Sequence, residues 1–445
     1  MLTEFRLENF KSYRQAVLPL APLTLLIGAN ASGKSNAIEA LRFLSWLAQD
    51  HKLSAIRYEV QQSDDIFRGT VKDLPYRGAR EFRFGCRATS SSSSIETLEH
   101  ILSTEWQEDF SLSIALRDED LRITDESISG SGKVPLYSVT QPATGASHDI
   151  RVAYNNFARG GKKPQITCSD QQLVLLQLQS PARFEAGHAK AQRVIPAVTR
   201  AYQQILSDIL FLDPAPRTMR GYSFKGEKQI RSDGRNLSGV LHELWEVEKK
   251  QKDLLDFIAS LPEQNITSLG FISTPRGEVM AALTETFGGE ERQIEAPLLS
   301  DGTLRVLAVA AALLTAPRGS MVVIEEIDNG VHPSRARLMM NGIRRVATQR
   351  GLRVLLTTHN PALMDALPDE ALGDVVFCFR DPEGGYSRLV RLSDLERAPS
   401  LLAQGSLGEL VTAGVLDRSV KARAAPSSRD GVQAWLEDLE QIGSR

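Results

Sequence analysis

The chain begins with an alternation of apolar and polar residues. Leu2–Phe10 alternates with a period of two, which is typical of a strand with one buried face. Leu23–Ile27 is almost wholly apolar and is followed by glycine, which predicts a central strand buried on both faces. Ser35–Ala48 then carries apolar residues at helical spacing. A strand, a glycine-rich turn and a helix in this order predict the start of an α/β domain.

The same kind of pattern returns in the last third of the chain. The apolar runs Met321–Ile324 and Arg353–Thr358 predict two more buried strands, and Arg335–Gln349 predicts a helix between them. Strand, helix and strand form a βαβ unit, which belongs to a parallel sheet. We therefore expect a discontinuous core domain made of residues 1–75 and 300–395.

The intervening residues first have the pattern of an antiparallel β insert, which we place at 76–205. Period-two alternation in Glu81–Cys86 and Phe110–Leu116 predicts two of its strands. The serine run Ser90–Ser94 between them is expected to be a surface loop. Asp125–Pro164 is rich in glycine, serine and proline and is predicted to be irregular.

Helical spacing dominates the next section. Ala191–Leu210 and Leu237–Leu261 are predicted helices, the second with a charged face, and we expect a helical lobe over 206–299. The second helix is too short for the coiled-coil arms of chromosome-structuring ATPases.

Residues 396–445 are predicted to be a C-terminal extension. Its apolar positions between Leu401 and Leu416 are spaced for short helices. Two interpretations stay open, because such helices can pack back on the core or present a docking surface. The acidic segment Val432–Ile442 is predicted to be a docking or disordered segment.

Composition excludes several classes of protein. Of the 445 residues 42% are hydrophobic and 24% are charged, which are ordinary globular values. The net charge of −3 excludes a globally basic nucleic-acid binder but not a local basic patch. Three well-separated cysteines match no metal site, so we expect a cytoplasmic protein. The longest apolar stretch, Val306–Leu314, is too short to cross a membrane, so no membrane partner is expected.

A phosphate-binding loop follows the second predicted strand. The residues GANASGKS, beginning at Gly28, match G-x-x-x-x-G-K-[ST] between a buried strand and a helix. We expect Gly28, Asn30 and Gly33 to surround the phosphates of ATP, whose charge the loop N–H groups and the helix dipole favour. Lys34 is expected to bridge the β- and γ-phosphates, and Ser35 to ligate Mg²⁺.

Acidic residues and a histidine follow the two later buried strands. Glu325 and Glu326 come directly after Met321–Ile324, and His359 follows the next strand. Because carboxyl ends of parallel strands lie beside the phosphate loop, Glu325 is expected on the metal side, where many such ATPases have aspartate. Glu326 is expected to polarise the attacking water, and His359 to contact the γ-phosphate.

A Ser-Asp-Gly turn precedes the predicted helix Leu304–Leu314. Ser300 is expected to cap this helix, whose N-terminus, with Gly302, can bind a phosphate. Such a turn is common on its own. Its order after the phosphate loop and before the acidic pair and the histidine indicates an ABC signature loop.

With these motifs the sequence resembles the RecF/SMC-type branch of ABC ATPases. It is similar to compact AAA family proteins related to the ATPase half of overcoming-lysogenisation-defect (OLD) nucleases. The resemblance is carried by these segments: Glu8–Tyr13, Gly28–Ser35, Asp64–Gly69, Leu212–Pro214, Arg220–Tyr222, Leu299–Arg305, Ile324–Pro333 and Thr358–Pro361. It implies an ABC-type ATPase head of α/β class, with a parallel or mixed sheet core, an antiparallel β insert and a helical signature lobe.

The resemblance also implies partners and further site residues. ATP in this family is sandwiched between the phosphate loop of one head and the signature loop of another, which implies a homodimer or higher homo-oligomer. Lys11 and Ser12 fall where family members contact nucleotide. The Q-loop glutamine cannot be placed, with Gln61, Gln62 and the segment 211–220 as candidates.

Related nucleases carry a C-terminal TOPRIM module, and the stretch after His359 has no Asp-x-Asp pair after a buried strand. We therefore expect an ATPase without its own nuclease. The resemblance then implies a sensor or regulatory subunit of a bacterial anti-phage defence system, acting with a separately encoded effector.

Two other functions remain to be weighed. A RecF-like DNA-binding ATPase in replication or repair is the alternative, with DNA contacted by local basic clusters. These clusters are Arg151, Arg159, Lys162 and Lys163, and Arg217, Arg220, Lys225, Lys228 and Arg231. The nucleotide-binding subunit of a transporter is disfavoured by the acidic pair, the large insert and the lack of a membrane-coupling segment.

Overall fold

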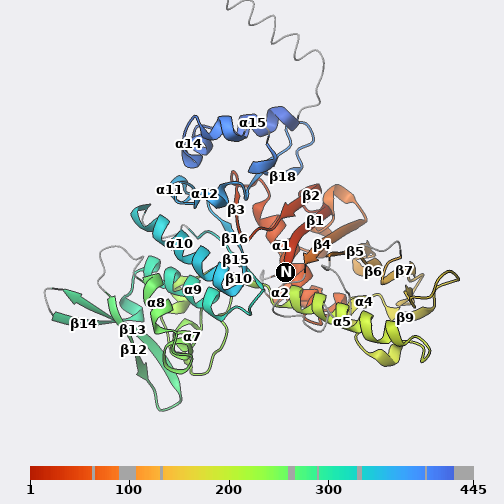
Figure 1. Ribbon diagram of the computed structural model, residues 1–445, viewed down its shortest axis with the longest axis horizontal. Helices are drawn as coiled ribbons and strands as arrows, with labels where there is room; N and C mark the ends of the chain where they lie inside the picture. Colours follow the sequence, from red (N-terminus) through yellow and green to blue (C-terminus); the bar gives the residue numbers. More distant parts are fainter. Residues whose placement is uncertain are drawn as a thin grey trace, which may run out of the picture.

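The computed structural model describes residues 1–62, 66–89, 107–130, 134–258, 266–287, 290–327, 333–395 and 398–424. Within these ranges the chain has a mixed α/β fold with one 14-stranded sheet and a separate four-stranded sheet (Figure 1). The predicted loop Ser90–Ser94 and the segment Val432–Ile442 lie outside the described residues.

Five neighbouring strands of the large sheet are parallel and form the core. Their order across the sheet is β10 (Leu210–Leu212), β15 (Met321–Ile324), β16 (Arg353–Thr357), β3 (Leu23–Ile27) and β17 (Val375–Arg380). The strands predicted around Leu23, Met321 and Arg353 are confirmed. Leu210 was predicted to end a helix, but it begins β10, whose apolar side chains are buried beside β15.

Both faces of this parallel core are buried. In β15, Met321 and Val323 belong to the hydrophobic core on one side of the sheet. Val322 and Ile324, which alternate with them, belong to the core on the other side. Helices α1 (Lys34–Ala48) and α5 (Ala189–Ser207) are among those that contribute to the first core. Helices α9 (Asp301–Thr315) and α10 (Pro333–Arg350) are among those of the second.

The rest of the large sheet continues from β17 into the β insert. The strands in order are β18 (Ser387–Arg391), β2 (Tyr13–Pro19), β1 (Leu2–Phe10), β4 (Glu81–Thr89), β5 (Gln107–Arg117), β6 (Asp120–Ser129), β7 (Tyr137–Gln141), β8 (Asp149–Tyr154) and β9 (Gln165–Ser169). Every pair in this series is antiparallel except β18 with β2. The insert therefore shares one sheet with the ATPase core.

The prediction that Asp125–Pro164 is irregular is wrong. Strands β6, β7 and β8 cross this segment, and the alternating residues Ile150, Val152 and Tyr154 of β8 are buried. The many glycine, serine and proline residues of the segment favoured the irregular prediction, although its short apolar alternations are typical of strands.

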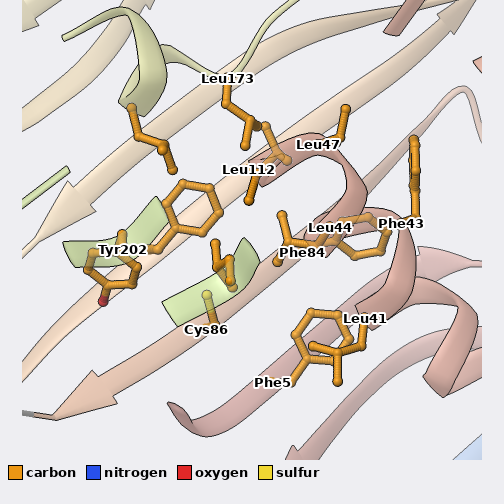
Figure 2. Packing of buried hydrophobic residues seen from close by; sticks show 14 of the residues in the cluster. Phe5, Leu41, Phe43, Leu44, Leu47, Phe84, Cys86, Leu112, Leu173 and Tyr202 are labelled. Atoms are coloured by element: carbon orange, nitrogen blue, oxygen red, sulfur yellow. The ribbon is translucent and has the colours of Figure 1, made fainter. Parts of the chain in front are cut away.

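An aromatic cluster joins helix α1 to the strands of the insert (Figure 2). The ring of Phe43 lies edge-on to Phe67 and Phe84, with ring centroids 5.5 and 6.1 Å apart. Phe84 on β4 is in turn 5.9 Å from Phe5 on β1. Tyr202 extends the same core to α5.

The section predicted as a helical lobe also contains a sheet. Its strands are β11 (Ser223–Phe224), β13 (Glu278–Phe287), β12 (Ile266–Ser273) and β14 (Glu290–Glu295), which lie at the opposite end of the molecule from β9 (Figure 1). The helix predicted over Leu237–Leu261 is divided into α7 (Leu237–His242), a π-helix (Glu243–Val247) and α8 (Gln251–Ile258). The division coincides with Lys249, whose φ is 55°. This left-handed conformation cannot continue an α-helix.

The C-terminal extension packs on the core up to its last described helix. Leu407 and Leu410 of α14 (Leu407–Thr412) and Leu416 of α15 (Val415–Ala424) are buried. The Gly408 N–H donates to Asp365 Oδ1 at 2.7 Å. Of the two interpretations left open for Leu401–Leu416, packing on the core is therefore the one found.

Short elements connect these parts. The remaining α-helices are α2 (Ile56–Gln62), α4 (Val174–Gln177), α6 (Pro216–Met219), α11 (Pro361–Met364), α12 (Asp369–Leu372), α13 (Ala398–Leu402), α14 (Leu407–Thr412) and α15 (Val415–Ala424). The 3₁₀ turns are η1 (Leu53–Ala55), η2 (Val71–Asp73), η3 (Tyr76–Gly78), η4 (Pro181–Arg183), η6 (Ala296–Leu298) and η7 (Leu392–Asp394). Within the described part of the chain, every helix is too short or too polar to cross a membrane.

The aromatic cluster predicts a large effect of one substitution. Phe43→Ala should destabilise the fold by about 3–5 kcal/mol, because it leaves a cavity among rings that cannot close around it. Calorimetry should show a clearly lower melting temperature. The matched control is Phe224→Ala, whose side chain is 60% exposed. Equal melting temperatures for the two variants would contradict the packing described.

Candidate nucleotide site

The phosphate-binding loop joins β3 to α1 in a conformation that depends on two glycines. Gly28 and Gly33 have φ angles of 147° and 122°, which side-chain-bearing residues rarely adopt. A Cβ atom on Gly28 would lie 2.1 Å from the Cys378 carbonyl oxygen, and one on Gly33 would lie 2.3 Å from Ser387 Oγ. Both glycines are therefore required by conformation and by close packing.

The β17–β18 hairpin supports this loop from behind. Ser387, which is fully buried, donates its hydroxyl to the carbonyl of Ser32 in the loop, and its Oγ lies within hydrogen-bond distance of Ser12 Oγ, at 2.8 Å. Asn36 of α1 donates to Ser12 Oγ, at 2.7 Å. Ser12, expected to bind nucleotide, thus lies buried behind the loop and contacts its scaffold.

A cavity of about 320 Å³ lies in front of the loop. The predicted site residues that line it are Asn30, Gly33, Lys34, Ser35, Glu325, Glu326 and His359. The other predicted residues, Lys11, Ser12, Gly28, Ser300 and Gly302, are not part of its lining. Lys34 folds back on the loop, where its ammonium donates to the carbonyls of Gly28 at 2.6 Å and Ala29 at 3.1 Å.

Glu325, at the end of β15, is held by an arginine that the sequence analysis missed. Arg42 of α1 donates to Glu325 Oε1 at 2.7 Å, and its guanidinium lies over the Phe211 ring at 5.1 Å. Burial raises the pKa of the Glu325 carboxyl, and the charge of Arg42 opposes that rise. The sequence signal that could have identified Arg42 is its position as a charged residue within the apolar stretch of α1.

Glu326 has a strained backbone beside this carboxylate. Its φ is 46°, an uncommon conformation for a residue with a side chain. The Glu326 N–H donates to Thr357 Oγ1 at 2.9 Å, which ties it to the end of β16. Such strain concentrates at functional sites, and Glu326 is exposed at the cavity.

His359 lies just beyond β16, before the short helix α11. Asn360 caps that helix by accepting from the Ala362 N–H at 2.9 Å, and its own N–H donates to Thr358 Oγ1 at 3.0 Å. His359 is exposed on the cavity wall between these fixed neighbours.

Two further arginines, Arg68 and Arg380, also line the cavity. Arg380 at the end of β17 donates to the carbonyl of Ala31 at 3.0 Å. Arg68 donates to Glu39 Oε1 at 2.6 Å. Lys11 contacts the same buried Glu39 and donates to the Arg68 carbonyl at 2.7 Å, so it supports Arg68 from outside the cavity. Arg68 belongs to a segment that carried the family resemblance, whereas no local motif marks Arg380.

The predicted signature loop lies on α9, away from this lining. Ser300 caps the helix as predicted, since its Oγ accepts from the Thr303 N–H at 3.1 Å. Arg220 holds the loop through the Leu299 carbonyl at 2.6 Å and Asp301 Oδ1 at 2.5 Å. Arg220 is therefore already engaged within the protein, although it was predicted as part of a basic cluster for DNA.

Comparisons with known families agree with this site. A family described as "AAA ATPase domain" matches residues 1–158, and one described as "AAA domain, putative AbiEii toxin, Type IV TA system" matches residues 178–365. The chain is an ATPase with AAA-family domains. The first match contains the phosphate-binding loop and the second contains the acidic pair and His359. None of the curated proteins matches the chain.

Solved structures of SMC heads are similar over most of the ATPase. One is a SmcHead bound to the C-winged helix domain of ScpA (16% identity, TM-score 0.43, 90% of this chain and 99% of that one). Others are the SMC head domain from Thermotoga maritima (13%, 0.40, 88% and 98%) and an Smc head domain with an extended coiled coil bound to the C-terminal domain of ScpA derived from Pyrococcus furiosus (14%, 0.41, 91% and 98%). Values this low carry no functional argument.

The close packing behind the loop predicts that Gly33→Ala abolishes ATP binding. The new Cβ would collide with Ser387, and the backbone would be strained. Adding Ser387→Gly should restore part of the affinity, because it removes the collision and leaves only the strain. A fluorescent ATP analogue measures both effects.

The control for strain alone is Gly160→Ala, at φ 71° with open space around the new Cβ. It should leave ATP affinity unchanged. If Gly33→Ala binds ATP as the wild type does, the hairpin does not constrain the loop.

Proposed function

We propose that the ATPase binds Mg²⁺–ATP in this cavity and hydrolyses it between two copies of the chain. The single observation that supports this most strongly is the meeting of the phosphate-binding loop, Glu325, Glu326 and His359 in one cavity, while the signature loop lies elsewhere on the chain.

The loop and the surrounding cations bind the triphosphate. The backbone N–H groups of the loop and the N-terminus of α1 attract phosphate oxygens. Lys34 turns from the carbonyls of Gly28 and Ala29 to the β- and γ-phosphates. Arg68 and Arg380 add two positive charges at the rim, which offset the charge of the nucleotide.

The residues at the ends of β15 and β16 act on the terminal phosphate. Glu326 orients and polarises the attacking water, and the hydrogen bond from its N–H to Thr357 holds it in place. His359 contacts the γ-phosphate from the end of the neighbouring parallel strand, β16. Glu325 stays beside Arg42, on the metal side.

The donor set fits magnesium. Ser35 and Glu325 present oxygen atoms to the same cavity. The described residues contain no cluster of three or more His, Cys, Asp or Glu side chains around one point. This suits Mg²⁺, which takes few protein ligands and completes its shell with phosphate and water. When bound, the ion neutralises charge on the phosphates.

A second copy of the chain would complete the site. Ser300 is exposed at the N-terminus of the 15-residue helix α9, whose dipole favours a phosphate. Because Ser300 and Gly302 do not line their own chain's cavity and Ser300 is exposed, this end of the helix is available to the γ-phosphate held by a partner. If the phosphate-binding loop of each copy faces the signature loop of the other, the result is a closed, two-fold homodimer.

The wider role that we propose is regulation of a separately encoded effector in anti-phage defence. It is supported by the motif resemblance to the ATPase half of OLD nucleases and by the match to a family described with a toxin–antitoxin system. Affinity capture from the native host is the test. Recovery of a nuclease or toxin supports the role, whereas recovery of DNA and repair proteins supports the RecF-like alternative.

Two substitutions separate binding from turnover. Lys34→Ala should abolish ATP binding. Glu326→Gln should retain binding but reduce the steady-state rate of phosphate release by about 100-fold or more, because the neutral amide cannot act on water. Glu383→Gln, on the β17–β18 turn, is the matched control. An undiminished rate for Glu326→Gln would remove this residue from the mechanism.

Mixing two inactive variants tests the shared site. Lys34→Ala and Ser300→Arg each damage a different half of the site, so a mixed dimer contains one intact site. We expect about a quarter of wild-type activity in an equal mixture, since half the dimers are mixed. Absence of activity when heterodimers are demonstrated by native mass spectrometry would contradict the shared site.

A further inference from the structure

A second and larger cavity lies where the ATPase core meets the β insert. Its volume is about 550 Å³, within the range of small-molecule sites. One wall comes from η1 and α2 and the other from the ends of β6, β8 and β9. The Leu53 N–H donates to the Gln171 carbonyl at 2.9 Å and fixes the two walls together. We call it the joint cavity.

A histidine on a buried carboxylate is part of the wall of the joint cavity. His148 Nδ1 lies 2.7 Å from Oδ1 of Asp170, whose side chain is completely buried. The carboxylate accepts this hydrogen bond, so Nε2 is the ring nitrogen left for a ligand, and it donates an N–H to an anion when the ring is protonated. The His148 side chain is half-exposed, and its ring is oriented by a group that nucleotide binding does not use.

The support behind His148 is a fixed polar network. Gln171 Nε2 donates to Asp170 Oδ1 at 3.0 Å, and the Asp170 N–H donates to the His148 carbonyl at 2.8 Å. Arg122 lies 3.6 Å from Asp170 Oδ2, and its own guanidinium donates to the Ser147 carbonyl at 2.8 Å. Buried polar groups in this number hold His148 in one position.

The acidic groups at the cavity rim already have cationic partners. Glu119 is paired with Lys72, which lowers the pKa of its carboxyl, and Asp120 lies 3.4 Å from Arg57. By contrast, exposed Lys52 forms no ion pair with any residue that the structure describes. The cavity therefore offers a lysine ammonium and an imidazole nitrogen to a ligand.

The remaining wall has a polar part, formed by Ser54, Ser169, Gln171 and Gln172, and an apolar part. Leu53, Ile56, Val71 and Leu121 line the cavity and are each at most 7% exposed. A ligand that contacts them needs an apolar or aromatic body as well as a negative group.

We propose that the joint cavity is a binding site for a small organic anion. Its carboxylate or phosphate group binds Lys52 and His148, and its apolar body packs on Leu53 and Leu121. The site is separate from the nucleotide cavity and does not depend on the function proposed above. It lies beside the C-terminal end of α1, the helix that begins at the phosphate-binding loop.

Three naphthalene probes test the site in the full chain by isothermal titration. They are 1-naphthyl phosphate, 1-naphthoate and neutral 1-naphthol. We expect at least one anion to bind about tenfold or more tightly than 1-naphthol, since hydrogen bonds to charged groups are worth about 1.5–3 kcal/mol. The preferred anion distinguishes a phosphate ligand from a carboxylate ligand. Anions that bind no better than 1-naphthol, or not at all at millimolar concentration, overturn the proposal.

Variants locate the binding. Lys52→Gln and His148→Gln should each weaken the anion about tenfold, whereas Lys162→Gln, an exposed lysine elsewhere in the insert, should not. Lys34→Ala should leave the affinity unchanged, because it alters only the nucleotide site. Unchanged affinity in Lys52→Gln, or loss of affinity in Lys34→Ala, contradicts the assignment. If His148→Gln lowers the melting temperature, Lys52→Gln alone decides.

Discussion

Burial of the parallel core on both faces is the constraint on which the rest of the ATPase depends. Side chains of β3, β15 and β16 point alternately into two hydrophobic cores, so an unpaired polar or charged side chain would be costly in the middle of these strands. The polar groups of the site are placed at the strand ends instead. Because the strands are parallel, their carboxyl ends share one edge, where the phosphate-binding loop, Glu325, Glu326 and His359 meet.

Support for this edge comes from both sides of the strand order. On one side, the β17–β18 hairpin lies against the loop closely enough to require glycine at two positions. On the other side, Arg42 of α1 forms an ion pair with Glu325, which directly follows β15. A buried carboxylate, Glu39, joins Lys11 and Arg68, and a charge so buried is stable only when it is paired. The scaffold around the loop is therefore held in place by contacts within the chain.

The β insert is a continuation of the ATPase sheet, with α1 packed across the boundary. Rings on α1, β1 and β4 pack together there (Figure 2). The joint cavity also lies between the ATPase core and the insert. A ligand at that boundary would contact both parts of the chain. The sheet carrying β12–β14 lies at the other end of the molecule (Figure 1).

The sequence by itself determined the buried strands, the phosphate-binding loop, the acidic pair, His359 and the cap of α9. Each is a local pattern, because apolar runs and fixed spacings specify neighbouring residues directly. It misjudged Asp125–Pro164, where a composition rich in turn-forming residues concealed three strands that pair with their neighbours in the sequence. It also placed a helix at Leu210, where β10 adds to the core.

Only the tertiary structure decided which distant residues surround the site. Arg42, Arg380 and Ser387 belong to no motif, and their roles arise from contacts with residues far away in the chain. Lys11 and Ser12 were expected to contact the nucleotide, but they contact residues that support the cavity and do not line it. Local spacing can place a side chain on an element, but only packing between elements determines what that side chain contacts.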